Sequence, residues 1–320
     1  MLRITPWILA AGLALTCASA LAQPYPAKPI RLVVGFPPGG GVDINARLLA
    51  PKLNEYLGQP VIVENRPGAG TNIANELVAK AVPDGYTLLI NTPAVAINMA
   101  LYRKLPYDTL RDLAAVSVFS EAPNILVVHN GVPARDVKEL VALARAKPGT
   151  MNYSSAGSGT TQHLAGELLK LRTQTDIVHV PYKGSAPSLT ALVAGEVDMS
   201  FANIPAIFQH VKAGRLRTLA STGAKRAELM PDVPTMKEAG IDVEVTVWYG
   251  VLAPAATPRE IVGTLANAIA KAARAPDIRQ RLLDQGAEPV GSTAEEFDRV
   301  LRAEVAKWQE VIGAAGIRAD

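Results

Sequence analysis

Phe36-Pro-Pro-Gly-Gly-Gly-Val-Asp43 is the stretch that decides the fold prediction, and Ser154-Ser-Ala-Gly-Ser-Gly-Thr160 repeats its pattern farther along the chain. Each stretch follows a β-rich run and precedes a helical pattern, so each is predicted to join the end of a strand to the start of a helix. A helix start carries unpaired backbone N–H groups and roughly half a positive charge, which makes it a candidate site for an anion. Two such loops could hold one carboxylate from opposite sides.

Short β-rich runs alternate with helical patterns along the rest of the chain, and several of the runs are apolar throughout. This alternation is typical of α/β sheets that are covered by helices on both faces. The predicted strands are Ile30–Phe36, Val61–Asn65, Thr87–Asn91, Val116–Phe119, Ile125–His129, Met151–Ser155, Ile177–Val180, Met199–Phe201, Leu216–Ser221 and Val243–Leu252. Capping boxes are predicted at Thr257-Pro-Arg-Glu260 and at Thr293-Ala-Glu-Glu296, where a final amphipathic helix begins.

The two glycine-rich loops lie far apart in the sequence, each within its own run of strand and helix units, so we predict two lobes. Residues 23–122 together with 246–320 are expected to form lobe 1, and residues 123–245 lobe 2. The segments Val116–Val128 and Val243–Pro254 are candidates for the chain crossings between them. Because ligands of such sheets bind outside the carboxyl ends of the strands, both loops should face one cleft.

The first 22 residues have the pattern of an export signal. Arg3 precedes the apolar run Trp7–Leu15, and Ala20-Leu21-Ala22 follows it, which predicts cleavage after Ala22 and a protein of the bacterial periplasm. The apolar run is shorter than the roughly 20 residues that a membrane-spanning helix needs. Cys17, the only cysteine, lies within the signal after Thr16. A lipid anchor on Cys17 is the alternative interpretation.

Composition and motifs exclude several classes of function. A net charge of +3 and an aromatic content of 5% do not favour a nucleic-acid partner. The sequence has no Gly-x-Ser-x-Gly elbow, no phosphate-binding loop and no cluster of metal ligands, so we expect neither an enzyme nor a metal or cofactor site. Ser155 or Ser158 with His163 and a distant Asp leaves a secreted serine hydrolase as an alternative.

Several motifs, in a fixed order from about Tyr25 to the C-terminus, carry a resemblance to a known family. They are Phe36-Pro-Pro-Gly-Gly-Gly with Asp43 and Ala46-Arg47, Val63-Glu-Asn-Arg-Pro-Gly-Ala-Gly70, Pro83-Asp-Gly-Tyr-Thr-Leu-Leu89, Val180-Pro-Tyr-Lys-Gly184, and Trp248-Tyr-Gly with Ala253-Pro254 and Thr257-Pro258. With these motifs the chain resembles the Bug family, the TctC-type periplasmic receptors of tripartite tricarboxylate transporters.

The resemblance implies a type II periplasmic binding-protein fold, or Venus flytrap, whose lobes close on a small organic carboxylate. It implies that N–H groups and hydroxyls of the two loops hold the carboxylate, and that a monomeric receptor delivers it to membrane permease subunits. A sensory protein that presents the same ligand to a membrane kinase is the alternative. Ala202 stands where the family commonly has an acid, which favours a carboxylate without an amino group.

The expected ligand contacts come from the loops and strand ends around the cleft. They are Phe36, Pro38, Gly39, Gly40, Asn91, Thr92, Ser154, Ser155, Ser158, Gly159, Thr160, His163, Tyr182, Asn203 and Trp248.

Structural roles are predicted for other polar residues. Asp43 lies in the first turn of a helix, where the helix dipole stabilises a carboxylate. Arg66-Pro-Gly-Ala-Gly70 is interpreted as a turn beside the cleft, and His129, His179 and His210 as structural histidines. For His163, a hydrogen bond to the ligand and one to its own loop are both open.

Overall fold

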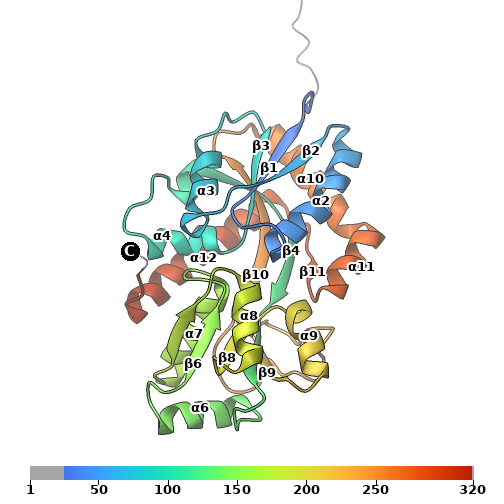
Figure 1. Cartoon of the computed structure of the whole chain (residues 1–320). Helices are drawn as coiled ribbons and strands as arrows, with labels where there is room; N and C mark the ends of the chain where they lie inside the picture. The colour runs from blue at the N-terminus through green and yellow to red at the C-terminus, as the bar shows by residue number, and fades with distance from the viewer. Residues whose placement is uncertain (1–24, 319–320) are drawn as a thin grey trace, which may run out of the picture.

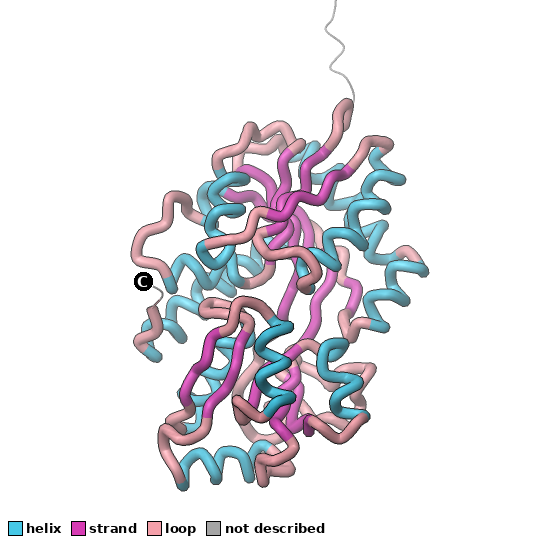
Figure 2. The backbone as a smooth tube through the Cα atoms, in the orientation of Figure 1, coloured by secondary structure: helices cyan, strands magenta, loops and turns pink. Residues whose placement is uncertain are grey.

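Two β-sheets divide the chain into two lobes, as the computed structural model of residues 25–318 shows (Figure 1). The predicted cleavage site after Ala22 and Cys17 lie outside the described residues. Lobe 1 contains a six-stranded sheet in the order β11-β4-β10-β3-β1-β2, and lobe 2 a five-stranded sheet in the order β7-β6-β8-β5-β9. Figure 2 shows the two groups of strands one above the other, with strands running between them.

Lobe 1 combines parallel and antiparallel pairing. Its strands are β1 (Ile30–Val34), β2 (Val61–Asn65), β3 (Thr87–Asn91), β4 (Leu113–Pro123), β10 (Thr246–Pro254) and β11 (Glu288–Pro289). β1 pairs in parallel with β2 and β3, whereas β10 runs antiparallel to β3 and β4. The carboxyl ends of the three parallel strands therefore lie at one edge of the sheet, and the loops that follow them lie there too.

Helices cover both faces of the lobe 1 sheet. They are α2 (Gly41–Leu57), α3 (Asn72–Ala79), α4 (Ala94–Leu101), α5 (Thr109–Asp112), α10 (Arg259–Arg274), α11 (Pro276–Asp284) and α12 (Ala294–Ala315), with the short 3₁₀ helix η2 (Ala69–Thr71). Successive residues of a strand face opposite sides. Leu32 thus belongs to the hydrophobic cluster that contains Leu49 of α2. Val33 belongs to the cluster on the other face, which contains Trp308 of α12.

Lobe 2 repeats the strand–helix alternation on a smaller scale. Its strands are β5 (Ile125–His129), β6 (Asn152–Ser155), β7 (Val178–Pro181), β8 (Met199–Ala202) and β9 (Leu216–Ser221), and its helices are α6 (Val137–Ala146), α7 (Thr161–Thr173), α8 (Ser185–Ala194) and α9 (Ile204–Lys212). β6 pairs in parallel with β7 and β8, while β5 runs antiparallel to β8 and β9.

The chain changes sheet at Asn124, between β4 and β5, and again before β10. Buried Thr222 joins these two crossings: its hydroxyl accepts the Asn124 N–H at 3.0 Å and donates to the Val245 carbonyl at 2.6 Å. The boundaries 122/123 and 245/246 therefore stay our proposal for the hinge between the lobes.

The structure confirms the α/β class and the ten predicted strands to within a few residues at their ends. β11 was not predicted, because a strand of two residues is too short to show an alternation of apolar and polar side chains. The capping box at Thr293 is confirmed by reciprocal bonds with Glu296. The one predicted at Thr257 is wrong: α10 begins at Arg259 without a side-chain cap, and the Thr257 hydroxyl donates to the Pro254 carbonyl at 2.7 Å.

Candidate functional site

The first glycine loop (residues 36–43) is held in shape by the carboxylate of Asp43. This carboxylate accepts the Gly39 N–H at 2.9 Å, the Arg47 guanidinium at 3.0 Å and the Asn65 amide at 2.9 Å, and the same amide reaches the Phe36 carbonyl at 3.0 Å. Burial by itself would raise the pKa of Asp43, but the hydrogen bonds from Arg47, Gly39 and Asn65 hold it below its usual value. The anionic side chain thus acts within the loop, as predicted from its place at the start of a helix.

The start of α2 presents free N–H groups. Gly40 is the N-cap, with an extended backbone (φ −82°, ψ 169°) and no side-chain cap, and the first intrahelical bond runs from Ile44 to Gly40. Within residues 25–318, no acceptor reaches the N–H groups of Gly41, Val42 or Asp43. These groups, together with the helix dipole, make the end of α2 suitable for an anion.

The second glycine loop (residues 154–160) uses more of its donors internally. The Ala156 N–H donates to Gln162 Oε1 at 2.8 Å, the Gly157 N–H to Ser155 Oγ at 3.1 Å, and the Gly159 N–H to His163 Nδ1 at 3.1 Å.

The Thr160 hydroxyl also acts within the second glycine loop, because it donates to the Gly157 carbonyl at 2.7 Å. Among the described residues, no hydrogen-bond partner is found for the hydroxyl of exposed Ser158 or for the N–H groups of Ser158, Thr161 and Gln162. An anion could therefore be held here by the Ser158 hydroxyl and the first turn of α7.

Three aromatic rings, those of Tyr153, His179 and His163, stack next to the second glycine loop. His163 stacks on His179 with ring centroids 4.1 Å apart, and His179 stacks on Tyr153 at 4.8 Å. Burial and the charge of Lys170 lower the pKa of His163 to about 4, while burial and the neighbouring His163 lower that of His179 to about 3. Both rings are therefore neutral at pH 7, and Nδ1 of His163 acts as the acceptor for the Gly159 N–H.

Ser155 pairs with His179, not with His163. Its Oγ lies 2.7 Å from His179 Nε2, and the residue is fully buried, so a substrate cannot reach this hydroxyl. The Ser155–His163 pair considered from sequence is therefore not formed.

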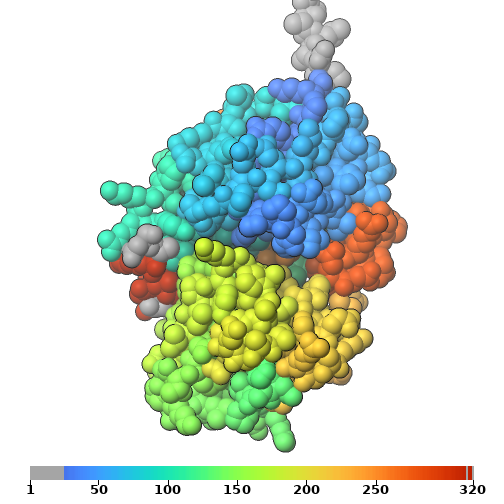
Figure 3. Space-filling model, in the orientation of Figure 1, coloured from blue at the N-terminus to red at the C-terminus, as the bar shows by residue number. Residues whose placement is uncertain are grey.

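The second glycine loop lies against lobe 1. A β-carbon built on Gly159 would lie 2.6 Å from Leu101 Cδ2 and 3.5 Å from Asn98 Oδ1, and both residues belong to α4. The space-filling view shows the lobes meeting across the middle of the molecule (Figure 3). A ligand group at the start of α7 would thus lie beside lobe 1.

Asn91 and Thr92 belong to a buried network behind the lobe 1 side of the cleft. Asn91 donates to Asn75 at 2.7 Å and accepts the Thr92 N–H at 2.8 Å, and further bonds join Asn72, Asn98, Thr71 and Tyr107. The network supports the segment Gly68–Thr71, all of whose residues have positive φ, including Thr71 at +80°. Left-handed backbone at a β-branched residue is strained, and the buried bonds hold it in place. The turn predicted at residues 66–70 has this form.

The other predicted contacts come from several elements of both lobes. Ser154 accepts a hydrogen bond from Ser188 at 2.8 Å, Tyr182 is half-buried after β7, and Asn203 is the half-buried N-cap of α9. Pro38 is exposed in the first loop. Trp248 is buried against Phe297, with ring centroids 5.0 Å apart, and its contact with a ligand stays a prediction.

Two residues near the helix starts were missed in the sequence. Tyr249 lies beneath the start of α2, and Asn124 donates to Thr161, the first residue of α7, at 3.3 Å. Within the part of the chain that the structure describes, the side-chain oxygen of Asn124 and the indole N–H of Trp248 are buried without a partner. The motif Trp248-Tyr249-Gly250 did point to the cleft, but strand alternation lets only one of the two aromatic rings face α2.

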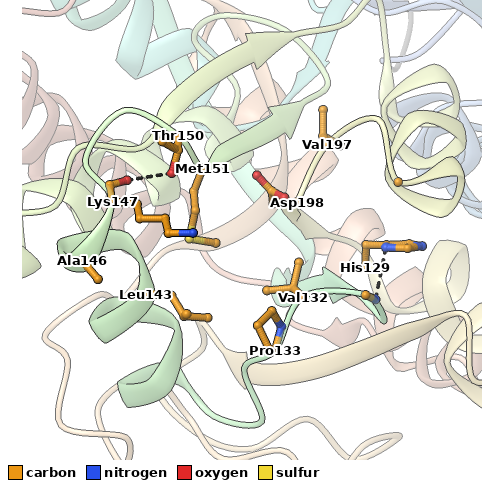
Figure 4. Close-up of a pocket in the computed structure, with 12 residues that line it drawn as sticks. His129, Val132, Pro133, Leu143, Ala146, Lys147, Thr150, Met151, Val197 and Asp198 are labelled. Atoms are coloured by element: carbon orange, nitrogen blue, oxygen red, sulfur yellow. Dashed lines mark hydrogen bonds between the residues drawn. The ribbon is translucent and has the colours of Figure 1, made fainter.

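A cavity of about 360 Å³ lies away from the cleft, at the end of lobe 2 that carries α6 (Figure 4). Its wall includes His129, Leu143, Lys147 and Asp198, and His129 Nδ1 accepts the Gly131 N–H at 3.2 Å. Neither glycine loop contributes to this cavity. In residues 25–318 no helix has the length and apolar character needed to cross a membrane.

Comparison with known proteins gives a consistent result. The family model described as "Tripartite tricarboxylate transporter family receptor", TctC, matches residues 45–317. Protein BugT of Bordetella pertussis is 36% identical over 98% of this chain and 96% of its own. Among solved structures, R. palustris Rpa4515 with adipate is 39% identical with a TM-score of 0.84, covering 92% of this chain and 99% of its own. MatC from Rhodopseudomonas palustris with bound malate is 32% identical with a TM-score of 0.81, covering 90% and 100%.

Proposed function

Because the chain belongs to the TctC family of tripartite tricarboxylate transporter receptors, we propose that it binds a small carboxylate between its lobes, at the starts of α2 and α7. The observation that carries this proposal is the set of free N–H groups on Gly41, Val42 and Asp43 at an uncapped helix start. Ser158 and the first turn of α7 supply donors from lobe 2.

The strength of these contacts is sufficient for a receptor. Micromolar binding requires about 8 kcal/mol. A hydrogen bond to a charged group contributes about 1.5–3 kcal/mol, and a helix end up to about 2 kcal/mol. Four or five such contacts would therefore exceed the requirement and offset the cost of ordering the ligand.

The ligand class follows from the relatives and from one position in lobe 2. The relatives solved with adipate and malate hold carboxylates that lack an amino group. Ala202, buried at the end of β8, offers no acid to an ammonium group. We therefore propose a mono- or dicarboxylate without an amino group as ligand.

The proposed function of the bound state is delivery of the ligand to a membrane transporter. A monomer, exported to the periplasm after cleavage at Ala22, would close on the ligand and present its closed face to the permease subunits of a tripartite tricarboxylate transporter. Closure is a population shift, since some contacts exist only when both loops touch one ligand.

Isothermal titration with adipate, malate, citrate, glutamate and glucose tests the proposal. A carboxylate should bind with a Kd near the micromolar range, and Ser158→Ala should weaken it roughly tenfold, as expected for one hydrogen bond to a charge. Lys147→Ala, in the cavity of lobe 2, is the control and should leave the affinity unchanged. Binding of glucose without any carboxylate, or loss of carboxylate binding in Lys147→Ala, would contradict the proposal.

A further inference from the structure

Tyr249 lies on β10, opposite Ser120 of β4, and its ring faces α2. Trp248 packs on the other face of the sheet against Phe297, as strand alternation requires. β10 is also the strand through which the chain returns from lobe 2 to lobe 1. Tyr249 thus lies next to the first glycine loop and on the strand that begins where the chain returns from lobe 2.

The Tyr249 hydroxyl reaches the first residue of α2. A β-carbon built on Gly41 would lie 2.6 Å from Tyr249 Oη and 3.4 Å from Cζ, so only glycine leaves room for the hydroxyl. The helix start is fixed above it: Asn45 donates to the Gly41 carbonyl at 2.8 Å and accepts the Ser120 hydroxyl at 2.7 Å. The arrangement of α2, β4 and β10 therefore defines where this hydroxyl lies.

The Tyr249 hydroxyl is a hydrogen-bond donor for which the described residues provide no acceptor. The ring of Tyr249 is buried, since the residue is 4% exposed, but the hydroxyl oxygen keeps some accessible surface: among the described residues, the fully enclosed polar side-chain atoms without a partner are Asn124 Oδ1 and Trp248 Nε1. Burial raises the pKa of Tyr249 to about 12, so the phenol keeps its proton at neutral pH. An anion at the start of α2 would provide the missing acceptor.

We infer that Tyr249 is a ligand-binding residue whose hydroxyl donates to the carboxylate held at the start of α2. The inference rests on the proposed function and extends it to the hinge, because the ligand then contacts β10 directly as well as both loops. Gly41 has a specific role in this arrangement, which is to leave space for the hydroxyl between the ring and the helix.

Tyr249→Phe tests the inference, since it removes one oxygen and keeps the ring. With adipate as the probe, the variant should bind roughly 10- to 100-fold more weakly than wild type, the range for one hydrogen bond to a charge. Tyr56→Phe makes the same chemical change near the other end of α2, where the ring packs under Lys271, and should bind like wild type.

Gly41→Ala provides a second readout that does not depend on the ligand. The added methyl should lower the melting temperature in the wild-type background, because it would lie 2.6 Å from the hydroxyl. In the Tyr249→Phe background the nearest contact is 3.4 Å, so the loss should be smaller.

Two results would overturn the inference. Wild-type affinity for adipate in Tyr249→Phe, with micromolar binding by wild type, would remove Tyr249 from the site and leave the proposed function standing. Equal losses of melting temperature from Gly41→Ala in both backgrounds would contradict the placement of the hydroxyl. Failure of wild type to bind any carboxylate would overturn the proposed function itself.

Discussion

The sequence left open whether His163 bonds to the ligand or to its own loop, and in the structure it bonds to the loop. Its Nδ1 accepts the Gly159 N–H, and its ring stacks on His179, so the residue shapes the second glycine loop. The sequence placed His163 at the right helix start but left its partner open. The stacking depends on the pairing of β6 with β7, which sets Tyr153 beside His179, and no local pattern predicts that register.

Acid should destabilise the protein through His163. Its folded pKa of about 4 lies below the value of about 6.5 expected in the unfolded chain. The stabilising contribution is thus complete above pH 6.5 and is lost as the pH falls towards 4, because the unfolded chain binds a proton that the folded protein does not. The slope is up to about 1.4 kcal/mol per pH unit for one such group.

Urea unfolding at several pH values between 6.5 and 4 measures this effect. His163→Asn does not titrate and keeps an acceptor for the loop, so its free energy of unfolding should fall less steeply than that of wild type. His179, whose pKa is also lowered, accounts for a remaining slope. Equal slopes in wild type and variant would show that His163 is not a neutral group held by burial.

The elements themselves were predicted well where their patterns are local. Strands occupy the predicted residues Val61–Asn65, Thr87–Asn91 and Ile125–His129. Short runs that contain β-branched residues and are bounded by turn residues favour a strand over a helix. The sequence pattern of a fully buried strand does not predict which face of the sheet each side chain points to. Tyr249 is the residue beside α2 and Trp248 packs against Phe297, while the predicted contact of Trp248 with a ligand stays a prediction.

We expect the two chain crossings at the proposed hinge to depend on Thr222. Replacing it by Val keeps the shape but leaves the buried Asn124 N–H and Val245 carbonyl without this partner. The free energy of unfolding should fall by about 1–3 kcal/mol, the cost of buried polar groups left unsatisfied. Chemical denaturation measures the change.

Thr264→Val is the matched control for the hinge variant. The Thr264 hydroxyl is exposed and bonds only to the Glu260 carbonyl of its own helix, at 2.9 Å, so the change should cost less than about 0.5 kcal/mol. Equal effects of the two substitutions would show that the Thr222 bonds do not hold the crossings.

At the scale of the whole molecule, we expect the proposed closure to depend on the contact of Gly159 with α4. Gly159 has φ +79°, and a methyl group there would lie 2.6 Å from Leu101 Cδ2 in the other lobe. Gly159→Ala should therefore keep the lobes apart and reduce the ligand-induced decrease in radius of gyration. Small-angle scattering with and without adipate measures this decrease.

Gly214→Ala separates closure from backbone strain. Gly214 also has a positive φ, +66°, but a methyl group there would meet nothing within 4 Å. This variant bears a similar backbone cost and should compact on ligand binding like wild type. Full compaction in Gly159→Ala would contradict the role given to the contact between the loop and α4.

One carboxylate is proposed to be held between the starts of α2 and α7, and a crystal structure with adipate tests this binding mode most directly. We predict one carboxylate group of adipate within about 3 Å of the Gly41 and Val42 nitrogens and of Tyr249 Oη, with Ser158 on the opposite side. Adipate bound in the cavity beside Lys147, or in the cleft without contact to the start of α2, would contradict the account.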